Sequence, residues 1–193
     1  MKRMFLFLTI LTIGIVSVSA EKGTKNEKMD TKEALYKEAV EALDQHRFVV
    51  TFHTAEQGSS MRINLDSRRN FLIIDGQKGF FQTSIDEDFS KGYMTGGVGL
   101  TPLKMLESDV VKTEKKCDKK GNITYTVVLN GRSIVGVKNV KEAKVALKKG
   151  SNDVMVEIKY KGGGRGRRAG SSVHTGSLHP VDAVNLERGI LYH

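Results

Sequence analysis

The chain changes from a helix-like pattern to strand-like alternation near residue 47. Between residues 30 and 47, apolar side chains recur every three to four residues, which places them on one helix face. They are Leu35, Tyr36, Ala39, Val40 and Leu43. Asp30 followed by Glu33 has the form of a capping box. We therefore expect one helix that begins at Asp30 and ends at His46 or Arg47, where a positive charge suits the helix dipole.

From residue 48 onward, short apolar or alternating segments are separated by turn residues. Asp75-Gly76 is the strongest hairpin signal, and residues 117–122 and 148–153 have the composition of further turns. The expected strands are 48–54, 61–66, 71–74, 80–85, 110–114, 123–129, 133–137, 143–147, 154–160 and 173–178. Parallel sheets need crossover helices, and the pattern predicts none after residue 47. The sequence predicts a mainly β fold, an antiparallel barrel or sandwich of about eight short strands with one N-terminal helix.

The first twenty residues have the form of a secretory signal peptide. Lys2 and Arg3 precede an uncharged apolar run over 4–16, and small residues follow it up to Ala20. The alternative is an uncleaved anchor, but the run is shorter than the ~20 residues that a spanning helix needs. We expect cleavage between Ala20 and Glu21 and no membrane-spanning segment in the mature chain. The protein is then exported, either periplasmic or secreted.

The expected organisation has three parts. Residues 1–20 are the signal peptide, residues 21–29 a flexible tether rich in charged and small residues, and residues 30–193 a single β-rich domain with an N-terminal helix. One cysteine in 193 residues excludes an internal disulfide framework and a multi-cysteine zinc site. The oligomeric state is not fixed by these features.

The chain is basic, with 31 Lys and Arg against 22 Asp and Glu and a net charge of +9. Loss of Lys2 and Arg3 with the signal peptide lowers this charge to +7. A basic surface suits an anionic partner. Because export argues against nucleic acid, the remaining interpretations are an anionic envelope component or lysines that serve solubility.

Several of the strand and turn segments resemble the domain of unknown function 4251 family, which comprises exported proteins of Bacteroidota. The matching segments are Ala42-Leu43, Phe48-Val49, Ile63-Asn64-Leu65, Asn70 to Gly76, Asp118 to Thr124, Val154 to Ile158, Gly176 to Pro180, and Gly189. The resemblance covers roughly Ala34 to Gly189. It implies a signal peptide and a mostly antiparallel β-domain with an N-terminal helix, and it transfers no activity and no functional residue. The glycine-rich basic stretch 162–168 departs from the family pattern.

Residues with catalytic or metal-binding chemistry are present without the spacing that such chemistry needs. Cys117 lies among four lysines, which favour a thiolate, but it reads as an exposed thiol at a hairpin tip. His174 and His179 could approach each other, yet the sequence nominates no third zinc ligand, so we interpret them as surface histidines. We therefore expect no catalytic residue, no metal, no cofactor and no enzymatic activity.

The preferred function is a binding module for a small apolar or amphiphilic ligand, because an antiparallel barrel of this size can enclose one. The residues proposed for the pocket rim are Phe81, Phe89, Tyr93 and Met105. Aromatic residues in such a segment are also common in an ordinary core.

The alternative function is an envelope-interaction or structural protein that uses its basic surface. Its candidate anion contacts are Arg165, Arg167 and Arg168 in the glycine-rich stretch. These arginines lack the interleaved aromatics that single-strand binding would use, and they also fit an exposed hairpin tip.

Overall fold

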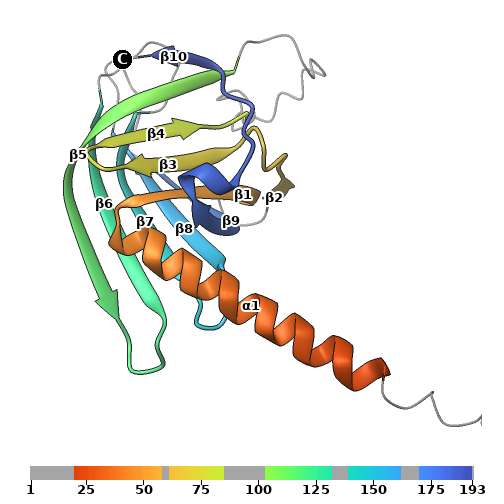
Figure 1. Ribbon diagram of the computed structural model, residues 1–193. Helices are drawn as coiled ribbons and strands as arrows, with labels where there is room; N and C mark the ends of the chain where they lie inside the picture. The colour runs from red at the N-terminus through yellow and green to blue at the C-terminus, as the bar shows by residue number, and fades with distance from the viewer. Residues whose placement is uncertain (1–19, 58–60, 85–102, 132–138, 162–169, 193) are drawn as a thin grey trace, which may run out of the picture.

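The computed structural model describes residues 20–57, 61–84, 103–131, 139–161 and 170–192, with only the backbone given for residues 20–28, 57 and 61. Within these residues, one α-helix, α1, precedes ten strands and one 3-10 turn, arranged as in Figure 1. The elements are α1 Ala20–Asp44, β1 Arg47–Gln57, β2 Met61–Asn64, β3 Phe71–Asp75, β4 Lys78–Gln82, β5 Lys104–Cys117, β6 Ile123–Gly131, β7 Val140–Leu147, β8 Asp153–Tyr160, β9 Gly170–Pro180, η2 Val181–Ala183 and β10 Ile190–Tyr192.

Eight of the strands close into an antiparallel barrel. Their order around the ring is β5-β4-β3-β1-β9-β8-β7-β6, and β6 pairs back with β5. Two strands lie outside the ring, since β2 pairs with β1, and β10 pairs with β5 in parallel. The predicted mainly β class with one N-terminal helix is confirmed, and the architecture is the barrel rather than the sandwich. The expected strand 133–137 lies outside the described residues.

The two ends of the barrel differ. At one end, which we call the helix end, tight turns join the strands, and Gly76, Gly121 and Gly150 adopt positive φ angles there. Helix α1 lies at this end, where the Tyr36 hydroxyl donates a hydrogen bond of 3.0 Å to the Gly121 carbonyl. At the opposite end, the loop end, β4, β6 and β8 finish and β5, β7 and β9 begin.

The interior of the barrel is filled by apolar side chains that alternate along the strands. Strand β6 illustrates this, since every second residue from Ile123 to Leu129 is buried. Helix α1 adds Ala39, Ala42 and Leu43 to the same cluster. Four of the five residues predicted on the helix face, Tyr36, Ala39, Val40 and Leu43, therefore belong to this core or pack against it.

Helix α1 begins at Ala20, ten residues before the expected start, so Asp30 lies within the helix and is not its N-cap. Residues 20–29 include alanine, glutamate, lysine and methionine, which favour helix, and no proline interrupts them. Figure 1 shows the C-terminal half of α1 against the barrel and its N-terminal half extending beyond it. The division into signal peptide, tether and domain stays a prediction.

A second apolar cluster lies on the outer face of the barrel wall. It consists of Val49, Phe71, Ile73 and Met105, all buried. Residues 181–192, which we call the C-terminal strap, cover it with Val181, Val184 and Leu186. The strap contains η2 and β10, which the sequence pattern did not predict.

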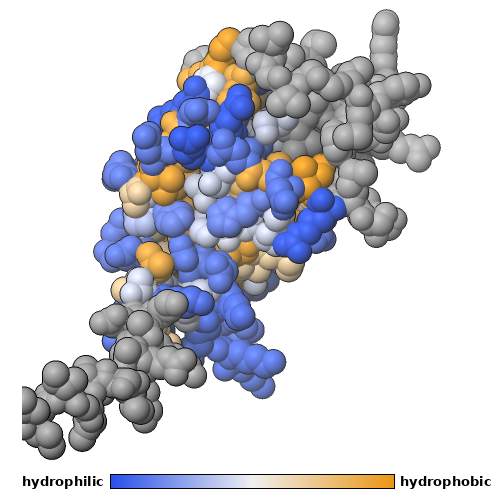
Figure 2. All heavy atoms as spheres, turned by 90° about the vertical axis from the view of Figure 1, so that its right-hand side faces the viewer, coloured by the Kyte–Doolittle hydropathy of each residue, from blue (hydrophilic) through white to orange (hydrophobic). Residues whose placement is uncertain are grey.

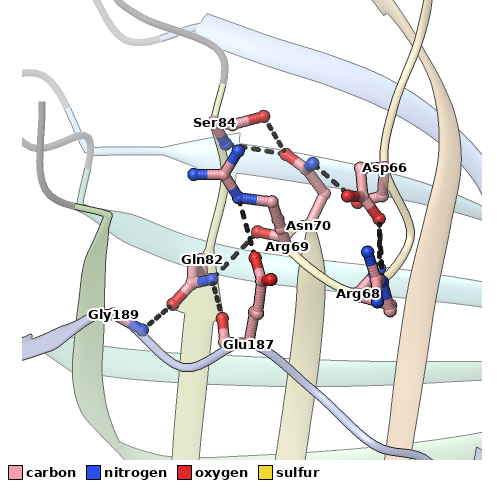
Figure 3. Close-up of polar contacts among 8 residues, drawn as sticks. All are labelled: Asp66, Arg68, Arg69, Asn70, Gln82, Ser84, Glu187 and Gly189. Atoms are coloured by element: carbon pink, nitrogen blue, oxygen red, sulfur yellow. Dashed lines mark hydrogen bonds and ion pairs between the residues drawn. The ribbon is translucent and has the colours of Figure 1, made fainter. Parts of the chain in front are cut away.

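Gln82 fastens the C-terminal strap to the barrel (Figure 3). Its side-chain nitrogen donates to the carbonyls of Arg69 at 3.0 Å and Glu187 at 2.8 Å. Its side-chain oxygen accepts from the Gly189 amide at 2.7 Å. Because Gln82 is fully buried, these three bonds replace water for the amide and for three backbone groups.

Candidate functional site at the loop end of the barrel

The residues predicted from the sequence as a pocket rim do not come together. Phe81 lies inside the barrel, whereas Met105 belongs to the outer cluster beneath the C-terminal strap. The barrel wall therefore separates the two side chains. Phe89 and Tyr93 lie outside the described residues, as do the predicted anion contacts Arg165, Arg167 and Arg168.

Three aromatic side chains meet within the barrel near its loop end. Phe52 of β1 lies 6.2 Å from Phe81 of β4, and Phe81 lies 6.3 Å from Tyr160 of β8, measured between ring centroids. Since β4 and β8 are opposite each other in the eight-strand ring, the second contact crosses the interior. We call these three rings the aromatic layer. They form an apolar surface across the barrel interior near the loop end.

A chain of hydrogen bonds runs from the loop end into the interior beside the aromatic layer. The Tyr160 hydroxyl is 2.8 Å from the Ser172 hydroxyl, which is 2.8 Å from Nε2 of His174. The first two residues are half-buried, whereas His174 is buried and lies 4.5 Å from the Phe52 ring. Polar groups are costly to bury unless they are hydrogen-bonded. These hydrogen bonds therefore offset the cost of placing Tyr160, Ser172 and His174 in a barrel whose interior is otherwise apolar.

The position of His174 corrects the expectation that the histidines are on the surface. On β9 the inward positions are 174, 176 and 178, all buried, and His179 occupies the opposite face. Alternation along one strand therefore keeps His174 and His179 apart. Burial lowers the pKa of His179, and the nearby His53 lowers it further, while Glu38 opposes them.

Burial raises the pKa of Tyr160 to about 12, although its hydrogen bond with Ser172 opposes the shift. The hydroxyl is therefore protonated and neutral at physiological pH. A neutral hydroxyl both donates and accepts hydrogen bonds. The arrangement suits recognition of a polar group on a mainly apolar molecule.

An open depression lies on the outer wall of the barrel. It has a volume of about 630 Å³ and is lined by residues that include His53, Arg62, Met155 and Thr175. Its lining comes from exposed strand faces and turns, whereas the polar chain at the loop end is inside the barrel. On the face drawn in Figure 2, hydrophobic areas are small and separated by hydrophilic ones.

Within the described ranges, no group of three or more metal-binding side chains comes together. Cys117 is a free, exposed thiol at the end of β5, as predicted. Among the helices that the structure describes, none has the length and apolar character to cross a membrane.

Sequence reasoning identified Phe81 but missed Phe52, Tyr160, Ser172 and His174. Phe52, Tyr160 and His174 occur in segments predicted as strands, whereas Ser172 directly precedes the strand predicted at 173–178. For Ser172 and His174, the inward direction depends on how β8 and β9 pair, which aligns Ile158 with Ser172 and Val156 with His174. A paired residue shares the face of its buried partner, and that register was not available from the sequence.

Comparison with known proteins places this barrel in a family. No curated protein matches the chain. A crystal structure of a DUF4251 family protein from Bacteroides eggerthii DSM 20697 superposes with a TM-score of 0.61 at 20% sequence identity, over 81% of this chain and 95% of that one. The family model described as a domain of unknown function, DUF4251, matches residues 30–163. The chain therefore belongs to the DUF4251 family, as its strand and turn segments had suggested.

Proposed function

We propose that this protein is a non-enzymatic binding domain that holds a small apolar or amphiphilic molecule at the loop end of its barrel. The observation that carries the proposal is the hydrogen-bonded chain of Tyr160, Ser172 and His174 beside the aromatic layer. Small-molecule sites combine an apolar lining with a few convergent polar groups. The loop end supplies both.

The way the barrel is filled supports a ligand position at the loop end. Towards the helix end, the interior holds Leu43, Phe48 and Tyr125, all buried. An eight-stranded barrel is narrow enough for such side chains to fill it, or for one small ligand to replace some of them. The apolar part of a ligand would therefore rest on the aromatic layer, with its polar part against the chain of hydroxyls and imidazole.

The proposed setting is outside the cytoplasm, in the periplasm or beyond the cell. The supporting features are the basic residues Lys2 and Arg3, the apolar run 4–16 and the small residues before Glu21. An exported binding domain would meet ligands of the envelope or the surroundings. No cofactor is proposed.

The test is native mass spectrometry of the chain from Glu21, purified from a bacterial periplasm, beside its denatured spectrum. We expect an extra mass in the native spectrum that disappears on denaturation. Ser172→Ala removes the central hydroxyl of the chain and is expected to reduce the retained mass. Ser171→Ala is the matched control, because Ser171 is exposed on the opposite face of β9, and it should retain the mass.

Either of two results would contradict the proposal. One is a bare protein mass that no added amphiphile changes. The other is a retained mass that falls equally with Ser171→Ala and Ser172→Ala, because the ligand would then not depend on the inward face of β9.

The alternative is that the protein binds an anionic envelope component through its basic surface. The hairpin tips at the helix end favour it, because exposed Lys119 and Lys120 lie beside exposed Lys148 and Lys149. The tips are joined where the Lys149 amide donates to the Asn122 side chain at 3.1 Å. Binding to anionic vesicles that weakens steeply as salt is raised would support this alternative over the first.

A further inference from the structure

The open depression on the outer wall, which we call the outer depression, lies over a row of outward-facing side chains. At paired positions on β6, β7, β8 and β9 these are Thr124, Ala146, Met155 and Thr175. Neighbouring strands are about 4.8 Å apart, so the row is roughly 14 Å long. Three of its four side chains are short, which leaves a hollow of about 630 Å³, a size that suits a small molecule.

Met155 makes the centre of the outer depression apolar. Its side chain is 56% exposed and lies between Ala146 on β7 and Thr175 on β9. Methionine adapts its shape to different ligands, because its side chain is unbranched and polarizable. Covering Met155 would remove apolar surface from water, so the centre of the row favours the hydrocarbon part of a ligand.

A cationic side chain is held at the β1–β2 end of the outer depression. Nε of Arg62 donates to the Thr54 hydroxyl at 3.3 Å, and this hydroxyl is 2.7 Å from the hydroxyl of Thr175. The other four N–H groups of the guanidinium stay available to a ligand. Glu56 is opposite Arg62 in the strand pair, yet Arg62 forms no ion pair with any residue in the described ranges. His53 lines the same end.

The carboxylates that line the outer depression lie away from Arg62, at the hairpin tips. They belong to Asp118, which follows β5, and Asp153, which begins β8. The Asp118 carboxylate already accepts hydrogen bonds from the amides of Lys120 at 2.8 Å and Asn122 at 2.9 Å. Strands β8 and β6 are separated from β1 by β9. An anionic group is therefore favoured beside Arg62, because a guanidinium binds carboxylate or phosphate through paired hydrogen bonds.

We propose that the outer depression binds an amphiphile with an anionic head group, a carboxylate or a phosphate. Arg62 holds the head group, with His53 beside it, and the hydrocarbon chain lies across Thr175, Met155 and Ala146. This site goes beyond the proposed function, because it is on the outer wall and does not depend on the interior of the loop end.

The test follows the methionine methyl signals of the mature chain by carbon–proton NMR as an amphiphile is added. The probes are decanoate and decyl phosphate, one for each head group, with 1-decanol as the neutral counterpart. We expect both anions to shift the Met155 signal saturably, and 1-decanol to bind roughly tenfold more weakly, the scale of one charge-assisted hydrogen bond. Met105 is the internal control, since it is buried beneath the C-terminal strap and its signal should not move.

Arg62→Gln removes the guanidinium and is expected to weaken binding of both anions roughly tenfold, with little change for 1-decanol. Arg68→Gln is the matched control. Arg68 is also exposed but does not line the outer depression, so its loss changes the net charge equally and should leave binding unchanged. Circular dichroism of each variant shows whether the barrel is retained.

Four outcomes would overturn the site. Binding of 1-decanol as tight as that of the anions, or an equal loss in Arg62→Gln and Arg68→Gln, would show that Arg62 does not hold the head group. Binding that leaves the Met155 signal unchanged would place the amphiphile elsewhere. A Met155 response that disappears in Ser172→Ala would show that the outer depression depends on the loop end. A retained mass in the native spectrum without a Met155 response would leave the proposed binding function standing alone.

Discussion

Replacing Gly176 with alanine is expected to destabilise the protein by about 3 kcal/mol or more. Gly176 is an inward position of β9 that pairs with Phe52 of β1 and Val154 of β8. A Cβ there would stand 2.0 Å from the Thr51 carbonyl oxygen and 3.2 Å from the Phe52 Cα. Both are backbone atoms of a strand held on two sides, so β1 and β9 would have to separate.

Urea unfolding of Gly176→Ala measures this loss, with Gly170→Ala as the control. Gly170 is on the same strand, and a Cβ there would meet no atom of the described residues within 4 Å. We expect the control to change the free energy of unfolding by less than about 0.5 kcal/mol. Equal stabilities for the two variants would show that β1 and β9 do not approach as the structure has them.

Replacing Gln82 with leucine is expected to cost about 3 kcal/mol and to release the C-terminal strap. The substitution keeps the size of the side chain but leaves the carbonyls of Arg69 and Glu187 and the amide of Gly189 without partners. Each buried backbone group left unpaired costs on the order of 1 kcal/mol. Gly189 also packs closely against Leu103, because a Cβ built on Gly189 would stand 2.1 Å from the Leu103 carbonyl oxygen.

Hydrogen exchange shows which amides lose protection in the variant and by how much. In Gln82→Leu the amides of Gly189 and Ile190 should lose protection, while those of β6 should lose less. Gln77→Leu serves as the control because Gln77 is exposed in the β3–β4 turn. Retained protection at Gly189 in Gln82→Leu would mean that the strap is held by its apolar contacts with the outer cluster instead.

The local elements of the fold were predictable, whereas its closure was not. The hairpin near Gly76 and the turn before Ile123 follow from residues close in sequence. The choice between barrel and sandwich depends on β1 pairing with β9, which joins Phe48 to Pro180 across most of the chain. No local pattern encodes such a pairing. Strand β10 has three residues, which are too few to show the alternation of apolar and polar positions that identifies a strand.

The candidate site was predictable only at Phe81, because a site inside a barrel depends on which face each residue occupies. Gln82 pairs with Met105, and Phe81 pairs with Leu106, one position along. A shift of one residue moves a side chain through the barrel wall, so Met105 lies beneath the strap and not beside Phe81. The same dependence concealed Ser172 and His174, whose small and polar side chains did not look like interior residues.

The most direct test of the central claim compares two neighbouring rings on opposite faces of β4. Phe81 lies in the interior, and Phe80 packs against the outer cluster. With 4-fluorophenylalanine at one position or the other, fluorine NMR can follow added 1-octanol. Binding at the loop end predicts a saturable shift at position 81 and none at position 80. A shift at position 80 alone, or at neither position, would contradict a ligand site inside the barrel.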